Sequence, residues 1–102
     1  MTGGKGPKAK GSGFERECVN LALAHGIDAK RAWGSNGKSL GYSESVDVVI
    51  GNLTGQCKRR KALAAYLKPP EGVDMALVRE DKGKILVIME LERFLESGTN
   101  RE

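Results

Sequence analysis

A two-residue break between strand-forming runs is the feature that most constrains the fold of this chain. Gly51 and Asn52 separate residues 46–50 (VDVVI) from residues 53–57 (LTGQC). Valine, isoleucine and threonine favour extended backbone, and glycine at the first central position of a two-residue connection favours a type II′ turn. The sequence therefore predicts a β-hairpin whose register is set by this turn.

That register gathers polar groups on one face of the predicted hairpin. Asp47 is expected directly opposite Gln56. Lys58 shares this face, whereas Cys57 points to the other one. The carboxylate of Asp47, the amide oxygen of Gln56 and the backbone carbonyl of Cys57 are hard donors that suit Mg²⁺, with Mn²⁺ able to substitute. A metal there would polarise a phosphoryl oxygen, and Lys58 would stabilise the developing charge. The simpler alternative is a surface hairpin with an Asp47–Lys58 salt bridge.

The rest of the chain is typical of one small α/β domain. It has 102 residues, 39% of them hydrophobic and 29% charged, which suits a modest aliphatic core. We predict a mixed central β-sheet flanked by helices, within a single domain over residues 13–97. A disordered basic arm is expected at 1–12 and a frayed tail at 98–102. The expected elements are helices over 13–25, 59–68 and 91–97, strands over 27–34, 46–50, 53–57, 73–79 and 84–90, and a mobile loop at 35–45.

Charge is distributed unevenly along the chain. The net charge is +4, but residues 1–70 hold twelve bases and five acids, whereas residues 71–102 hold five bases and eight acids. Clustered basic charge suggests a polyanion partner such as nucleic acid, and an unevenly charged soluble domain is the alternative. No apolar run approaches the roughly 20 residues of a membrane helix, and no signal peptide is visible, so we expect a cytoplasmic protein without a membrane partner. Cys18 and Cys57 are expected to be free, buried thiols.

Four short blocks occur in a characteristic order along the first part of the chain. They are KGSGFERE at 10–17, RAWGS at 31–35, VDVV at 46–49 and QCK at 56–58. Together they resemble the archaeal-type Holliday junction resolvases of the PD-(D/E)XK nuclease superfamily. The resemblance implies a restriction-endonuclease-like core of order αβββαβ, and a homodimer that cuts four-way DNA junctions symmetrically with a metal. The segment QCKRRK, together with GFE, is also similar to Mrr-type nucleases.

The resemblance implies roles for individual residues. Glu15 matches the helix glutamate that helps to hold the metal, and Asp47 matches the metal-binding aspartate. Gln56 occupies the usual position of an acid, which should weaken metal binding although an amide oxygen still coordinates. Lys58 matches the catalytic lysine, and Ser35 matches a serine that lies near the scissile phosphate.

Basic residues outside the metal site are expected to contact DNA phosphates. Arg16 and Arg31 match basic positions that either face DNA or form structural salt bridges. Two alternatives to a junction resolvase stay open: a Mrr-like endonuclease acting on duplex DNA, and a DNA-binding domain with a decayed catalytic site. A small stand-alone resolvase fits a phage, archaeal or bacterial nucleoid setting. The remaining candidates for phosphate contacts are Lys5, Lys8, Lys10, Lys38, Arg59, Arg60, Lys61 and Lys68.

Overall fold

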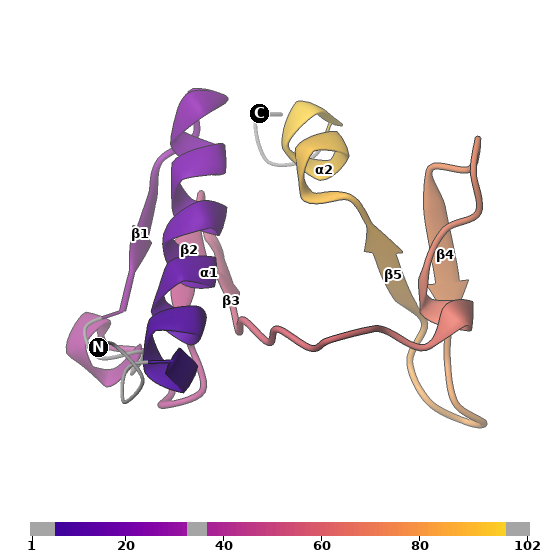
Figure 1. Ribbon diagram of the computed structural model, residues 1–102, viewed down its shortest axis with the longest axis horizontal. Helices are drawn as coiled ribbons and strands as arrows, with labels where there is room; N and C mark the ends of the chain where they lie inside the picture. The colour runs from indigo at the N-terminus through magenta and orange to yellow at the C-terminus, as the bar shows by residue number, and fades with distance from the viewer. Residues whose placement is uncertain (1–5, 33–36, 98–102) are drawn as a thin grey trace.

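Within residues 6–32 and 37–97, which the computed structural model describes, the protein is α/β with two α-helices and two antiparallel sheets. Figure 1 shows α1 beside the first sheet, and the second sheet standing apart from it, joined through an extended segment and through α2. The elements are α1 (Gly6–Ala24), β1 (Ala29–Arg31), the 3₁₀ turn η3 (Gly37–Leu40), β2 (Val48–Ile50), β3 (Leu53–Gly55), the 3₁₀ turn η4 (Ala65–Leu67), β4 (Met75–Val78), β5 (Leu86–Met89) and α2 (Leu91–Ser97).

The first sheet contains the predicted hairpin. β2 lies in the middle and pairs antiparallel with β1 on one side and β3 on the other. The β2–β3 register is the predicted one, with Val48 opposite Gly55 and Ile50 opposite Leu53. Gly51 has a φ of 62°, which a type II′ turn requires of its first central residue. The predicted turn is therefore confirmed, and the predicted register holds from Val48–Gly55 to Ile50–Leu53.

α1 covers one face of the first sheet. Glu15, Val19 and Ala22 recur at helical spacing and are all buried, so they form the side of α1 that faces the sheet. The helix ends before Gly26, which adopts the left-handed conformation (φ 78°) that is common just after a helix C-terminus.

The start of α1 differs from the prediction. The helix begins at Gly6, so it includes residues 6–12, which we predicted to lie in a disordered arm. Pro7 lies in the first helical turn, where its missing N–H removes no intrahelical hydrogen bond. No later proline interrupts the helix, so the favourable segment from 13 onward can extend toward the N-terminus.

The core lies between α1, the first sheet and α2. Ala22, Ile27 and Leu95 form a buried cluster, and Leu95 is fully buried. α2 begins and ends where the sequence predicted, and it contributes Leu95 to the cluster. The hydrophobic residues packed around this cluster are Leu21, Ala29, Ile50, Leu91 and Phe94.

The second sheet is a separate two-stranded hairpin. β4 and β5 run antiparallel, and every pair along them is apolar, from Met75 opposite Met89 to Val78 opposite Leu86. The predicted single mixed sheet is therefore wrong for the described residues, which form two antiparallel sheets. Residues 79–85 connect the two strands, with a turn closed by a hydrogen bond from the Gly83 N–H to the Glu80 carbonyl, and neither strand joins an edge of the first sheet.

An extended segment, residues 56–64, joins β3 to η4 where a helix over 59–68 was predicted. That prediction is wrong, because only Ala65–Leu67 is helical, as a single 3₁₀ turn. A helix of about ten residues is marginal in water unless it buries an apolar face, and both Leu63 and Tyr66 are exposed here. The helix that the order αβββαβ requires between β3 and the next strand is thus absent from the described residues.

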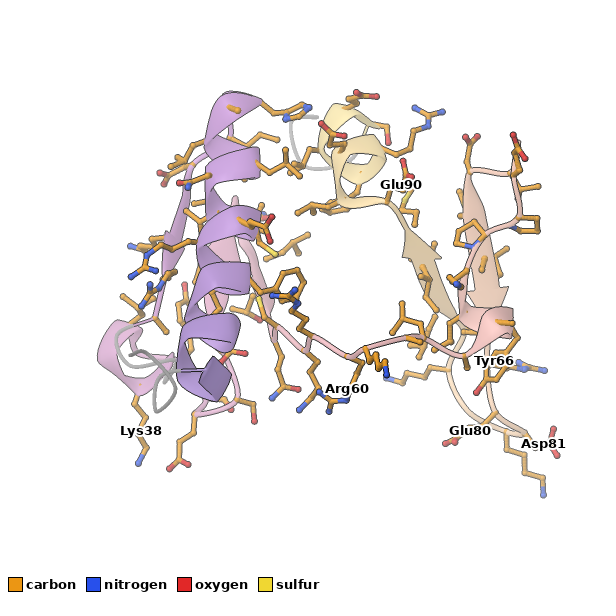
Figure 2. All side chains as sticks on the ribbon, viewed as in Figure 1. Lys38, Arg60, Tyr66, Glu80, Asp81 and Glu90 are labelled. Carbon is orange, nitrogen blue, oxygen red and sulfur yellow. The ribbon has the colours of Figure 1, made fainter. Side chains whose placement is uncertain are left out.

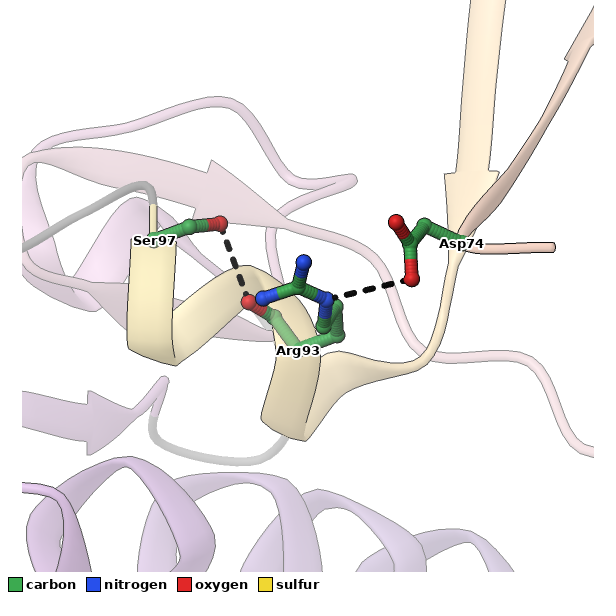
Figure 3. A network of polar contacts seen from close by, with 3 residues as sticks. All are labelled: Asp74, Arg93 and Ser97. Carbon is green, nitrogen blue, oxygen red and sulfur yellow. Dashed lines mark hydrogen bonds and ion pairs between the residues drawn. The ribbon is translucent and has the colours of Figure 1, made fainter. Parts of the chain in front are cut away.

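A polar contact joins α2 to the chain just before β4. Figure 3 shows Arg93 Nε donating a hydrogen bond to Asp74 Oδ1 (3.3 Å) and Ser97 Oγ donating to the Arg93 carbonyl (3.0 Å). Asp74 and Arg93 are both exposed, so their ion pair adds little stability. It is one contact between α2 and the chain just before β4.

Candidate metal and nucleic-acid site

Two buried carboxylates lie where α1 passes the first sheet. Glu15, on the sheet-facing side of α1, is 5% exposed, and Asp47, directly before β2, is 9% exposed. Among the described residues no other charged or polar residue is buried. Buried acids are rare unless they are paired or bind a cation, so this pair defines the candidate site.

Hydrogen bonds fix Asp47 at the end of the β2–β3 ladder. Its N–H donates to the Gly55 carbonyl and its own carbonyl accepts from the Ala32 N–H, both at 2.8 Å. Its carboxylate oxygen Oδ2 accepts a hydrogen bond from the backbone N–H of Cys57 (2.7 Å). Asp47 therefore does not form the ladder pair with Gln56 that the register predicts, because Gly55 already takes its N–H.

Glu15 on α1 forms an ion pair with Arg31 on β1. Arg31 Nε lies 3.7 Å from Glu15 Oε1, and the Arg31 side chain is 27% exposed. Because this pair is partly removed from water, its attraction is stronger than that of a surface pair. Of the two roles that the sequence left open for Arg31, the structure favours the structural salt bridge. Arg16 lies exposed on α1.

The thiols of Cys18 and Cys57 lie side by side next to the carboxylates. Each thiol affects the pKa of the other, so the two side chains are neighbours where α1 meets the segment after β3. Burial raises the pKa of both thiols above the usual value, and the pKa of Cys57 reaches about 12. After burial, the causes for Cys57 are its neighbour Cys18 and the negative charges of Glu15 and Asp47, which disfavour a second anion.

Cys57 is expected to react slowly with iodoacetamide at neutral pH. Only the thiolate is nucleophilic, and a pKa of about 12 leaves very little thiolate under these conditions. The labelling rate should rise about tenfold per pH unit while the chain stays folded, since the thiolate fraction rises in that proportion. Timed labelling followed by peptide mass spectrometry measures this rate, with the urea-unfolded chain as control. Equal rates for Cys57 in the folded and unfolded chains would contradict the prediction.

Gln56 and Lys58 flank Cys57 at the protein surface. Both side chains are exposed. Within the described part of the chain, neither forms a hydrogen bond or an ion pair with Asp47, so the simple Asp47–Lys58 salt bridge is not formed. The candidate site therefore has a buried part, Glu15 and Asp47, and an exposed part, Gln56 and Lys58.

Two carboxylates by themselves would suit only a hard cation that keeps several waters. Among the described residues, no three His, Cys, Asp or Glu side chains are grouped so that they could hold a metal ion. Mg²⁺ would therefore need the amide oxygen of Gln56, the carbonyl of Cys57 or water, in addition to Glu15 and Asp47. Mg²⁺ commonly binds proteins through one or two carboxylates and waters, and a cation would offset the cost of burying acidic groups.

Exposed basic side chains follow the site along the extended segment. Arg59, Arg60 and Lys61 are all exposed, and Arg60 Nη1 donates a hydrogen bond to the Arg59 carbonyl (3.2 Å). Figure 2 shows Arg60 and Lys38 projecting from the same edge of the molecule. Lys38 forms an exposed ion pair with Glu44 (3.0 Å), so part of its charge is already balanced. Lys68, further along the chain, is also exposed.

Four of the predicted residues cannot be placed at the site. Lys5 and Ser35 lie outside the described residues. The backbones of Lys8 and Lys10 belong to α1, and their side chains lie outside the described part of the chain.

Cys18 is the residue of the site that sequence reasoning missed. It lies three residues after Glu15, on the side of α1 that faces the sheet. The predicted hairpin also sends the Cys57 side chain away from the face of Gln56 and Lys58. Taken together, these two patterns could have placed the thiols against each other.

Comparison of the chain with protein-family models, curated proteins and solved structures finds no match. None of the described helices has both the length and the apolar character needed to cross a membrane. The functional conclusion therefore depends on the residues of the site.

Proposed function

We propose that the protein is a metal-dependent endonuclease that cuts branched DNA, with four-way junctions as its substrate. The observation that supports this most is the pair of buried carboxylates, Glu15 on α1 and Asp47 before β2, beside the strand end that carries Gln56 and Lys58. These residues are far apart in the sequence, yet they belong to one region of the fold. The four sequence blocks, which lie between residues 10 and 58, also support the proposal.

Asp47 and Glu15 would hold Mg²⁺, or Mn²⁺ in its place, together with Gln56, the Cys57 carbonyl and water. When bound, such a cation polarises the phosphate and activates a coordinated water. Asp47 is well prepared to be a ligand, because the Cys57 N–H fixes Oδ2 while Oδ1 accepts no hydrogen bond within the described residues. The exposed ammonium of Lys58 is able to approach the phosphate oxygens and to stabilise charge that develops on them.

Positive charge next to the site supports a nucleic-acid backbone as the substrate. Lys58, Arg59, Arg60 and Lys61 are consecutive, exposed, and not interrupted by any acid between residues 48 and 70. Such a cluster binds phosphates and recognises shape rather than base sequence. Binding should weaken steeply with salt. The logarithm of the binding constant should fall with the logarithm of the salt concentration, with a slope near −0.9 per neutralised phosphate for duplex DNA.

A homodimer would supply the two active sites that symmetric cutting of two strands requires. The β4–β5 hairpin supports such a dimer, because Leu77 and Val87 lie opposite each other and are 65% and 56% exposed. Ile85, just before β5, is also 65% exposed. An isolated two-stranded hairpin is marginal in water, and exposed apolar surfaces of this kind mark protein contacts. Sedimentation analysis of the chain tests the dimer, and a monomer at micromolar concentration would exclude it.

Cleavage of a synthetic four-way junction tests the proposed activity. The full chain is incubated with an end-labelled junction, or with linear duplex of the same sequence, in Mg²⁺, Mn²⁺ or a chelator. Metal-dependent symmetric cuts in the junction alone support a resolvase. Equal cutting of the duplex favours the Mrr-like endonuclease, and junction binding without cutting in either metal favours a decayed DNA-binding domain.

The substitution Gln56→Glu is expected to tighten Mn²⁺ and Mg²⁺ binding by roughly tenfold, because it adds a charged oxygen donor to the site. Gln56 is exposed, so the substitution should not disturb the fold. Calorimetric titration with Mn²⁺ measures the affinity, and cleavage at low Mg²⁺ should rise with it. Unchanged metal affinity would exclude residue 56 from the ligand set. Lost activity in a folded variant would show that the amide has a specific role.

A further inference from the structure

The two cysteines of the chain come from separate elements and meet at one place. Cys18 lies on the sheet-facing side of α1, three residues after Glu15 and four before Ala22, both of which are buried. Cys57 lies two residues past Gly55, at the end of β3. Both residues are half-buried, and each thiol affects the pKa of the other.

The strand pairing of the first sheet independently explains why the side chains of Cys18 and Cys57 are neighbours. Ala29 and Ile50 pair with each other and pack against the core beneath α1, so they mark the face of the sheet that α1 covers. Val48 shares that face, since it is two residues from Ile50. A Cβ atom on Gly55 would lie 3.2 Å from Val48 Cγ2, which places this position on the same face. Cys57 is two residues after Gly55, so its side chain lies on the same face of the sheet and points toward α1.

We propose that Cys18 and Cys57 form a reversible disulfide that ties α1 to the segment after β3. The oxidant is a small-molecule disulfide. One cysteine thiolate attacks a sulfur of this molecule, which forms a mixed disulfide and releases one small thiol. The second cysteine then attacks the mixed disulfide, which forms the Cys18–Cys57 bond and releases the other small thiol. Two protein thiols are oxidised, one small disulfide is reduced, and the two protons end on the released thiols.

The fold favours a bond within one chain over bonds between chains. It already places the two half-buried cysteine side chains on the side of the first sheet that α1 covers, so the loop between residues 18 and 57 is largely closed before the bond forms. Because both cysteines are half-buried, a small oxidant reaches them more easily than another protein does. The chain has two cysteines, so no other intramolecular pairing exists.

The bond would restrict the candidate site. Cys57 lies between Gln56 and Lys58, and its N–H donates to the Asp47 carboxylate. A covalent link from Cys57 to α1 would also tie this segment to the helix that carries Glu15. This consequence for metal binding and cleavage rests on the proposed function, whereas formation of the disulfide does not.

Oxidation of the full chain with glutathione disulfide tests the bond directly. We expect the intact mass to fall by the two lost hydrogens, with no glutathione attached, and peptide mapping to link the Cys18 peptide to the Cys57 peptide. Cys18→Ser and Cys57→Ser, which each keep one thiol, should instead gain one glutathione. The oxidised chain should melt roughly 10 °C higher than the reduced chain, because the bond closes a long loop, and dithiothreitol should reverse the shift.

Three results would overturn the proposal. The first is a wild-type chain that accumulates glutathione adducts, and the second is one that links to another chain. The third is a folded chain whose thiols are still free once exchange with glutathione disulfide has reached equilibrium, because the raised pKa of both thiols slows the exchange but does not set its end point. None of these measurements uses metal or DNA. A failed cleavage assay would therefore leave the disulfide standing, and a missing disulfide would leave the proposed nuclease standing.

Discussion

Replacing Lys58 with alanine is expected to reduce DNA cleavage to a small residual rate and to leave junction binding nearly unchanged. The side chain is exposed and makes no hydrogen bond or ion pair with the other described residues, so its removal should cost little stability. An ammonium group beside the reacting phosphate stabilises charge in the transition state, and the loss of such a group lowers turnover by about 10²–10³-fold. Single-turnover cleavage and gel-shift binding of a four-way junction measure the two effects separately.

Lys84→Ala provides a matched control for this variant. Lys84 is an exposed lysine just before β5, on the hairpin that stands apart from the candidate site (Figure 1). The control removes the same charge without touching the extended segment, and its cleavage rate should stay close to that of wild type. Retained turnover in Lys58→Ala would remove Lys58 from the mechanism. Equal losses in both variants would indicate a general effect of net charge.

Asp47→Ala and Asp47→Asn are expected to separate the structural role of this residue from its chemical role. Alanine removes the acceptor of the Cys57 N–H and should lower the free energy of unfolding by about 1–3 kcal/mol, since a part-buried donor loses its partner. Asparagine keeps an oxygen acceptor at this position and should cost less stability. Both variants lose the carboxylate, so both should lose cleavage by at least about 10²-fold if Asp47 holds the metal.

Urea unfolding and junction cleavage measure these two effects on the same preparations. Mn²⁺ titration adds a third measurement, in which both variants should bind more weakly than wild type. An alanine variant as stable as wild type would show that the Asp47–Cys57 hydrogen bond contributes nothing to the fold. A fully active asparagine variant would exclude the carboxylate of Asp47 from catalysis.

The hairpin of the first sheet could be predicted because its signals are local. Gly51 stands at the one position of the turn that requires a positive φ, and the alternation of the flanking residues then fixes the pairs. α2 was predicted over its full extent for a similar reason. Leu91, Phe94 and Leu95 recur at helical spacing, and Leu95 enters the core.

Contacts between distant segments decided what the sequence could not predict. A helix over 59–68 would have needed a surface on which to bury Leu63 and Tyr66, and the fold does not supply one. The position of Asp47 depended on which carbonyl takes its N–H, a choice that strand periodicity does not make. That Glu15 and Asp47 both lie near Cys57 could be predicted only through the family resemblance, because no local pattern tells where α1 crosses the sheet.

The stretch at residues 62–64 belongs to neither a ladder nor a helix as it crosses between the two sheets. Because this backbone pairs with no strand, an added residue would not shift any strand register. The entropic cost of lengthening a connection also grows only slowly with its length. Insertions and deletions should therefore be tolerated best at this point. A fluorophore or epitope spliced in there would report on the neighbouring hairpin without displacing the strand that follows Asp47.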